Sequence, residues 1–247
     1  MAYRGIKAKN DEQKALFQSF ESDTPFFAIT GPAGTGKTLL AMAYGMHQVF
    51  ETKSRFRKDK IIYTRLQVDV GKEVGFLPGT IMEKSDQYFA PFYDNYTKLD
   101  MPNQPMSRGE LNNDRIEMMP IQSVRGRTFE NCFIIVDEAQ NLDYHTMATL
   151  ATRVGENTQM VFLGNFSQID EARVNTPETN GFYRTLEALY NDGAKAIPYF
   201  KHVNLTKIER SGAAAYMEQL LRENVADNKF YEMESRGNQA GVGVEVS

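Results

Sequence analysis

The strongest structural signal in this chain is the segment Ile29-Thr30-Gly31-Pro32-Ala33-Gly34-Thr35-Gly36-Lys37-Thr38. Its last eight residues, 31–38, match the pattern G-x-x-x-x-G-K-[ST] without a mismatch. The apolar run over residues 26–29 is long enough for a buried strand, and apolar residues after the segment recur at helical spacing. Because a strand, a glycine-rich turn and a helix are the context that this pattern requires, the segment predicts a loop that binds the phosphates of a nucleotide.

The chemistry expected of this loop is the binding of an anion. Glycines allow backbone N–H groups to converge on phosphates, and the first turn of the next helix adds unpaired donors and the positive end of its dipole. We expect Lys37 to reach the β- and γ-phosphates and the Thr38 hydroxyl to hold Mg²⁺. The loop residues assigned to nucleotide binding are Gly31, Pro32, Ala33, Gly34, Thr35, Gly36, Lys37, Thr38 and Leu39.

Length and composition indicate an ordinary globular chain. Its 247 residues suffice for one large domain or two small ones, and 41% hydrophobic and 24% charged residues are typical values. No apolar run approaches the ~20 residues of a membrane span, and the N-terminus lacks the apolar core of a signal peptide. The single cysteine, Cys132, fits a reducing compartment, and the three histidines lack zinc-site spacing. We therefore expect a cytoplasmic protein without a membrane partner.

Charge limits the interaction with nucleic acid. The net charge of −4 argues against wholesale coating of a nucleic acid but allows a local basic site. The basic connection over residues 53–60 reads as a solvated loop. The aromatic residue within it, Phe56, also fits a nucleic-acid contact, so both interpretations stay open.

Alternating strands and helices predict an α/β fold, with a mainly parallel sheet flanked by helices. The predicted strands cover residues 26–29, 61–63, 132–136, 160–163 and 203–205. The predicted helices cover residues 11–20, the stretch after the phosphate loop, the region of 147–154, residues 183–190 and a last helix over 213–224. Residues 80–99 are amphipathic, and 101–115 are loop-like because they contain two prolines and a glycine.

The domain organisation expected from these elements is simple. Residues 1–230 form a single domain with a polar lead-in over residues 1–24. Residues 231–247 are expected to form a flexible tail, because residues 237–247 are rich in glycine and valine and have no helical period.

Two adjacent carboxylates, Asp137 and Glu138, follow the clearest predicted strand directly. The carboxyl end of a parallel strand is where doubly wound sheets bind ligands. We expect Asp137 to hold Mg²⁺, directly or through water, and Glu138 to act as general base on the attacking water. A kinase for small molecules does not need a water-activating glutamate here, so the pair favours hydrolysis. The alternative is an acidic pair that stabilises a helix N-terminus.

A polar segment follows the next predicted strand and reads Gly164-Asn165-Phe166-Ser167-Gln168-Ile169-Asp170. An amide just after a neighbouring parallel strand can reach the γ-phosphate and respond to its loss. Gln168 is therefore the candidate γ-phosphate sensor, and a glutamine that caps a turn is the alternative.

Taken together, these segments resemble the PhoH family of P-loop ATPases, in a compact form such as phages carry. The resemblance runs from about residue 10 to about residue 224. It rests on residues 31–38, on Gly75-Phe76-Leu77-Pro78-Gly79, on Arg125-Gly126-Arg127-Thr128, on Val136-Asp137-Glu138-Ala139-Gln140-Asn141 and on residues 164–170. It implies a RecA-like P-loop core similar to one domain of superfamily 1 helicases, ATP and Mg²⁺ as cofactors, and a link to RNA.

The resemblance also implies roles for individual residues. Gln13 is expected to read the adenine edge, unless it is an exposed helix residue. Arg210 corresponds to a late arginine of the family and would be an arginine finger, unless it only forms a surface salt bridge. The residues expected at the nucleic-acid backbone, where the forked donors of arginine suit phosphate, are Arg65, Arg125, Arg127 and Thr128.

The chain departs from the family pattern in two places. Asn165 stands where the family usually has Asp, and Ser211 stands where His is common. We also expect no PIN nuclease domain, so any cleavage of RNA would need a separate nuclease partner.

The sequence therefore predicts a Mg²⁺-dependent ATPase coupled to RNA or single-stranded DNA, with Lys37, Glu138, Gln168 and Arg210 as catalytic residues. Because the chain has length for one core domain only, Arg210 is expected to act on a neighbouring subunit of a closed homo-oligomeric ring. Two alternatives stay open: an ATP-gated module that recruits a partner, and a small-molecule phosphotransferase.

Overall fold

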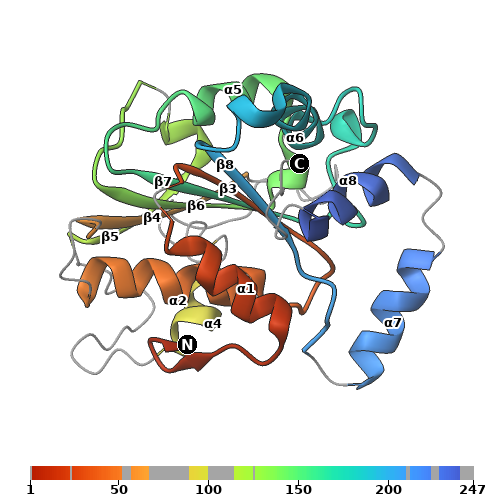
Figure 1. The fold of residues 1–247 in the computed structure, drawn as a ribbon, viewed down its shortest axis with the longest axis horizontal. Coiled ribbons are helices and arrows are strands. Elements are labelled where there is room, and N and C mark those ends of the chain that lie inside the picture. Colours follow the sequence, from red (N-terminus) through yellow and green to blue (C-terminus); the bar gives the residue numbers. More distant parts are fainter. Residues whose placement is uncertain are drawn as a thin grey trace, which may run out of the picture.

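A six-stranded sheet forms the centre of the molecule (Figure 1). The computed structural model describes residues 2–22, 24–51, 57–66, 89–99, 114–124, 126–209, 212–223 and 228–239. The sheet has the order β5-β4-β6-β7-β3-β8, and each neighbouring pair is parallel. The strands are β3 (Phe26–Thr30), β4 (Lys60–Arg65), β5 (Ile116–Pro120), β6 (Cys132–Asp137), β7 (Gln159–Gly164) and β8 (Phe200–Asn204). The predicted α/β fold with a parallel sheet is confirmed.

Helices cover both faces of this sheet, as Figure 1 shows. One face carries α1 (Asp11–Phe20), α2 (Lys37–Phe50) and α4 (Ala90–Tyr96), and the other carries α5 (Tyr144–Ala151) and α6 (Gly181–Asp192). The remaining described elements are β1 (Ala2–Tyr3), β2 (Ile6–Lys7), η1 (Ile121–Val124), η2 (Ala139–Asn141), η3 (Ala172–Val174), η4 (Gly193–Lys195), α7 (Gly212–Glu223) and α8 (Asn228–Gln239). Among the helices in these ranges, none has the length and apolar character needed to cross a bilayer.

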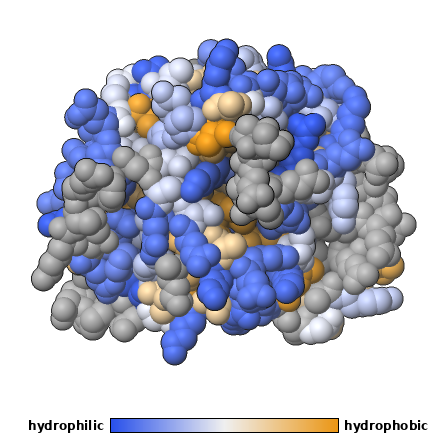
Figure 2. Space-filling view, in the orientation of Figure 1, coloured by the Kyte–Doolittle hydropathy of each residue, from blue (hydrophilic) through white to orange (hydrophobic). Residues whose placement is uncertain are grey.

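The residues of strand β6 are apolar almost throughout, because both faces of this strand are covered. Successive side chains of a strand point to opposite faces. Phe133 and Ile135 enter the core beneath α1 and α2, whereas Ile134 and Val136 enter the core beneath α5 and α6. A central strand of a two-faced parallel sheet is therefore buried along its whole length. On the face that Figure 2 shows, most of the coloured surface is hydrophilic, and groups of hydrophobic residues lie between the polar ones.

Side-chain caps determine where three helices begin. Asn10 accepts a hydrogen bond from the Gln13 N–H at the start of α1, at 3.0 Å. Asp143 caps α5 through the Thr146 N–H, and Asn180 caps α6 through the Tyr183 N–H. Each cap pairs one of the N–H groups that a helix N-terminus leaves without an internal partner.

The end of the chain differs from the sequence-based expectation. The prediction of a flexible tail from residue 231 is wrong for residues 231–239, which belong to α8. Phe230, Met233 and Glu234 of this helix are buried. The absence of a helical period holds for residues 237–247, and most of α8 precedes that segment. Gly237 lies so close to β8 that a Cβ atom would come within 2.7 Å of the Asn204 nitrogen.

A buried chain of hydrogen bonds joins α6, β8 and β3. The Thr30 hydroxyl donates to Asn204 Oδ1 at 3.1 Å, so its oxygen accepts from His202 Nε2–H at 2.8 Å. The other ring nitrogen, Nδ1, is then unprotonated and accepts from the Tyr190 hydroxyl at 2.8 Å. These contacts hold His202 in the neutral form, and burial lowers the pKa of His202 to about 3.

We expect His202 to make stability depend on pH. Its folded-state pKa of about 3 is below the ordinary 6.5, so between these values the unfolded chain binds more protons at this group than the folded chain does. The free energy of unfolding should therefore fall by about 2 kcal/mol from this group as the pH drops from 7 to 5.

Urea unfolding at pH 7 and pH 5 measures this effect. His202→Gln cannot titrate and should lose this part of the pH dependence, although it is less stable at pH 7. His145→Gln is the matched control, because His145 is exposed. Equal pH dependence in the wild type and in His202→Gln would contradict the assignment.

Candidate nucleotide-binding site

A pocket with a volume of about 310 Å³ lies at the carboxyl edge of the parallel sheet. The phosphate loop between β3 and α2 forms its floor, and the ends of β6 and β7 form one wall. Residues of the lead-in and of α4 also line the pocket. The residues that line it include the predicted site residues Gln13, Ala33, Gly34, Gly36, Lys37, Thr38, Leu39, Asp137, Glu138 and Gln168.

The backbone of the phosphate loop requires its glycines. Gly31, Gly34 and Gly36 have φ angles of 130°, 83° and 92°, which L-residues rarely adopt. A Cβ atom on Gly31 would also lie 2.0 Å from the Leu205 carbonyl oxygen. Gly36 precedes the first residue of α2, so the N–H groups of the first helical turn face the pocket.

Lys37 and Thr35 hold the loop from within. The Lys37 ammonium donates to the carbonyl oxygens of Gly31 and Pro32 at 2.7 and 2.9 Å. The Thr35 hydroxyl donates to the Pro32 oxygen at 3.1 Å. The Lys37 charge therefore lies directly over the loop, where it can bind phosphate oxygens.

Asp137 is the last residue of β6 and is buried at the pocket. Its Oδ2 accepts from the Tyr63 hydroxyl at 2.5 Å, and its Oδ1 accepts from the Glu138 N–H at 3.0 Å. Burial, followed by the charge of Glu138, raises the pKa of Asp137. A cation beside this pair would offset both effects.

The donor set fits Mg²⁺. Within the described ranges, no group of three His, Cys, Asp or Glu side chains could hold a metal without other ligands. Mg²⁺ is usually bound by one or two protein oxygens together with water and substrate phosphates. Asp137 and the half-buried Thr38, which both line this pocket, supply such oxygens.

Glu138 has a left-handed backbone with a φ angle of 55°. This conformation costs a residue other than glycine about 1–2 kcal/mol, so contacts around it must offset the strain. Gln140 provides one of them, because its Nε2 donates to Glu138 Oε2 at 2.5 Å. The carboxylate of Glu138 is thereby held at the pocket wall.

Gln140 is a site residue that sequence reasoning missed. It is fully buried, and its Nε2 also donates to the Gln168 carbonyl oxygen at 3.0 Å. Its Oε1 accepts from the Asn165 N–H at 3.0 Å. Gln140 thus joins Glu138 to residues 165–170, which we call the β7 loop. The signal in the sequence that could have identified Gln140 as a site residue is its position in the Asp-Glu-Ala-Gln-Asn segment.

Gln168 is exposed and lines the pocket from the β7 loop. Its N–H donates to the Asn165 carbonyl oxygen at 3.0 Å, which closes a turn. Asn165 Oδ1 accepts from the N–H and the hydroxyl of Ser167 at 3.2 and 2.7 Å. An Asp carboxylate could accept the same bonds. Asn165 Nδ2 is buried and has no hydrogen-bond partner in the described part of the chain.

Gln13 lies in the pocket wall and is buried. Its Oε1 accepts from the Lys9 N–H at 2.9 Å, and its Nε2 donates to the Thr35 carbonyl oxygen at 3.0 Å. The amide therefore ties the lead-in to the phosphate loop. Recognition of adenine by Gln13 stays a prediction.

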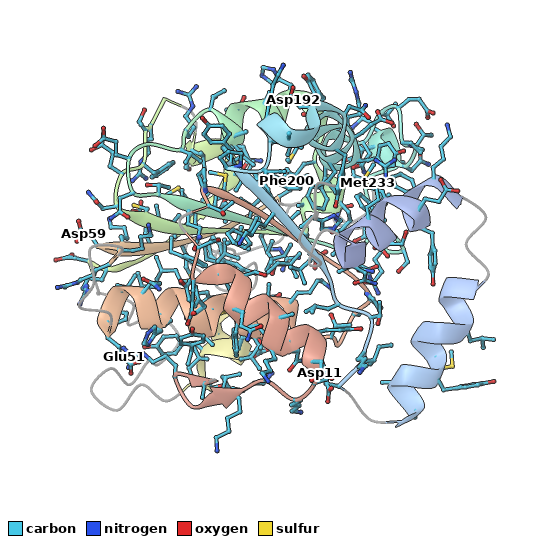
Figure 3. The ribbon with its side chains drawn as sticks, in the orientation of Figure 1. Asp11, Glu51, Asp59, Asp192, Phe200 and Met233 are labelled. Carbon is cyan, nitrogen blue, oxygen red and sulfur yellow. The ribbon has the colours of Figure 1, made fainter. Side chains whose placement is uncertain are left out.

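Residues 205–209, which we call the β8 connector, are held against the phosphate loop. The Glu12 carboxylate accepts from the N–H groups of Thr206 and Lys207 at 2.7 and 3.1 Å. The Glu209 N–H donates to the Gly34 carbonyl oxygen at 2.9 Å. Figure 3 labels Asp11, where α1 begins near this connector. Arg210 follows the connector but lies outside the described residues.

The residues proposed for nucleic acid fall at different places. Arg65 ends β4 beside Asp137, at the same edge of the sheet as the pocket. Arg127 pairs with Glu117 at 2.7 Å, near the start of β5 and away from that edge. Thr128 is exposed next to Arg127, and Arg125 lies outside the described residues. The nucleic-acid roles of these residues stay predictions.

Fold and site together define a RecA-like P-loop NTPase. The chain belongs to the PhoH family, because the family model described as "PhoH-like protein" matches residues 5–222. Protein PhoH2 of Bacillus subtilis (strain 168) is 38% identical over 223 residues, which cover 88% of this chain and 48% of that protein. A PhoH-like protein of Mycobacterium tuberculosis (strain ATCC 25618 / H37Rv) is 41% identical over 165 residues, which cover 67% and 45%. The chain spans about half the length of these relatives.

The solved structures to which this chain aligns include Pif1 helicases. The Pif1 helicase from Candida albicans has a TM-score of 0.44 and 16% identity, and the match covers 92% of this chain and 47% of that chain. Unliganded Pif1 from Bacteroides sp has a TM-score of 0.41 and 16% identity, and the match covers 92% and 48%.

We expect Gly31→Ala to destabilise the protein by about 3 kcal/mol or more, because the new Cβ atom meets a backbone oxygen at a positive φ angle. Gly212→Ala is the matched control, since a Cβ atom there meets nothing within 4 Å. Denaturant unfolding compares the two variants. A Gly31→Ala protein as stable as Gly212→Ala would contradict the close packing of Gly31 against Leu205.

Proposed function

We propose that this protein hydrolyses ATP in a Mg²⁺-dependent reaction that is coupled to the binding or remodelling of RNA, or of single-stranded DNA, in the cytoplasm. The observation that carries the proposal is the convergence of a phosphate loop, two acidic residues and an exposed amide in one pocket. Lys37, Asp137, Glu138 and Gln168 come from three separate segments and line that pocket together.

The mechanism follows from where these groups lie. The N–H groups of the loop and the Lys37 ammonium bind the β- and γ-phosphates. Thr38 and Asp137 hold Mg²⁺, which neutralises charge on the phosphates when it is bound. Glu138, oriented by Gln140, takes the proton from the attacking water. Gln168 contacts the γ-phosphate and responds to its loss.

Glu138 favours the hydrolysis of ATP over the transfer of its phosphate to a small metabolite. Its strained backbone and its bond from Gln140 direct a carboxylate to the pocket that also contains the phosphate loop. Strain of this kind gathers at functional sites. A phosphotransferase would instead need a second subsite that binds the acceptor.

Membership of the PhoH family and its implied link to RNA support the nucleic-acid part of the proposal. Arg65 ends β4 beside Asp137 at the carboxyl edge of the sheet, and we propose that it connects nucleic acid with the nucleotide. We further propose that Arg210 acts on a neighbouring copy in a ring. The support for this proposal is the correspondence of Arg210 with a late arginine of the family, and Arg210 itself lies outside the described residues.

An ATP-gated module is the second candidate function. In that case nucleotide occupancy would control the recruitment of a nuclease or another partner, without unwinding. Two results together would favour the gate. A Glu138→Gln protein loaded with ATP would capture a partner that it does not capture without ATP, and the wild type would displace no strand.

We expect Glu138→Gln to bind ATP with wild-type affinity and to lose about 10²–10⁴-fold in kcat, because a general base contributes on this scale. Phosphate release measures turnover, and a fluorescent ATP analogue measures binding. Glu156→Gln is the control, because Glu156 is exposed and belongs to another loop. Hydrolysis at the wild-type rate by Glu138→Gln would exclude Glu138 as the base.

We expect single-stranded RNA or DNA to stimulate the ATPase, and Arg65→Ala and Arg127→Ala to reduce this stimulation more than the basal rate. Glu117→Ala is the matched control for Arg127, because it breaks the same ion pair and leaves the arginine available. ATPase rates with and without each polymer, alongside native mass, give the result. If the basal and the stimulated ATPase rates of Arg127→Ala fall together, Arg127 has a structural role. If the wild type is a monomer at full activity, Arg210 does not act on a neighbouring subunit.

A further inference from the structure

The backbone of the β7 loop is held by bonds to every N–H group from residue 165 to residue 168. Two of these bonds stay within the loop, from Ser167 to Asn165 Oδ1 and from Gln168 to the Asn165 carbonyl oxygen. The other two leave it. The Asn165 N–H donates to Gln140 Oε1, and the Phe166 N–H donates to Glu234 Oε1 at 3.1 Å.

Glu234 is a buried carboxylate on α8, with only 2% of its surface exposed. Burying a carboxylate is unfavourable unless hydrogen bonds compensate the lost hydration. A bond between a backbone N–H and a carboxylate is charge-assisted and stronger than a neutral one. Glu234 therefore restrains the loop at the residue that lies two positions before Gln168.

Aromatic packing places this carboxylate. The Phe230 ring, one turn before Glu234, stacks on Phe166 with centroids 5.1 Å apart and an angle of 24°. The Tyr183 ring meets the edge of Phe230 at 5.5 Å. Stacked and edge-to-face pairs of this kind stabilise by about 0.5–1.5 kcal/mol each.

The other end of α8 is held against the sheet. Gly237 lies against Asn204 and the His202 ring, with no room for a side chain. Met233, labelled in Figure 3, is buried on the same helix. Helix α8 is thus fixed at β8 on one side and at the β7 loop on the other.

We infer that Glu234 is a positioning residue of the ATPase site, and that α8 holds the β7 loop in the conformation that presents Gln168 to the γ-phosphate. The inference rests on the proposed function. The bond from Glu234 is to the β7 loop and not to a residue that binds the nucleotide in the proposed mechanism, so its removal should affect the hydrolytic step and leave nucleotide binding in place.

Two substitutions separate the hydrogen bond from the packing. Glu234→Gln keeps an acceptor oxygen at the same distance along the side chain, and Glu234→Leu keeps the bulk and removes the acceptor. Glu232→Ala is the matched control, because Glu232 is exposed on the same helix. A full-length chain of each variant is assayed, with its cooperative unfolding checked first.

We expect Glu234→Leu to lower kcat about tenfold with KM within about twofold of the wild type, because a lost bond to a charged group is worth at least this much. Glu234→Gln and the control should retain kcat within about twofold. A wild-type kcat in Glu234→Leu, or an equal loss of kcat in Glu234→Gln, would overturn the inference.

Hydrogen exchange gives a readout that does not depend on hydrolysis. The Phe166 amide should exchange at least about tenfold faster in Glu234→Leu than in the wild type, and should stay protected in Glu234→Gln. Unchanged protection of Phe166 in Glu234→Leu would overturn the inference even if that variant is inactive. If the wild type hydrolyses no ATP, the proposed function fails, and the exchange result still decides whether Glu234 holds the loop.

Discussion

Because all six strands of the sheet run parallel, the loops that follow their carboxyl ends all lie at one edge of the sheet. The phosphate loop after β3, the acidic pair after β6 and the β7 loop therefore meet, although the first two are separated by a hundred residues. This edge concentrates backbone N–H and C=O groups that no sheet or helix can pair. The architecture of the pocket follows from how those groups find partners.

Side chains from distant segments supply several of these partners. Gln140 bonds both ends of the turn in the β7 loop, and Glu234 bonds its middle. Glu12 does the same for the β8 connector, which in turn contacts the phosphate loop. Where these bonds are buried they are strong and their loss is costly, so the β7 loop depends on Gln140 and Glu234 for its conformation.

Local pattern was sufficient for part of this picture. Residues 31–38 carry their own turn and helix signals, and the apolar β-branched strand before Asp137 is unmistakable in sequence. Strand β5, Ile-Glu-Met-Met-Pro, was missed because it lacks β-branched residues beyond the first and has no clean alternation. Helix α8 was missed because only its contacts with Phe166 and His202 explain a glycine in its interior.

The amino-acid sequence alone determined the fold class, the family resemblance and the residues predicted to bind phosphate and metal, because each depends on short-range spacing. The tertiary structure alone decided which groups orient them: Tyr63 on Asp137, Gln140 on Glu138 and Glu234 on the β7 loop. It also placed Arg127 in an ion pair away from the pocket. The physical reason is that a hydrogen bond between residues far apart in the chain leaves no periodic trace in the sequence, and only the packing of helices on the sheet brings its two partners together.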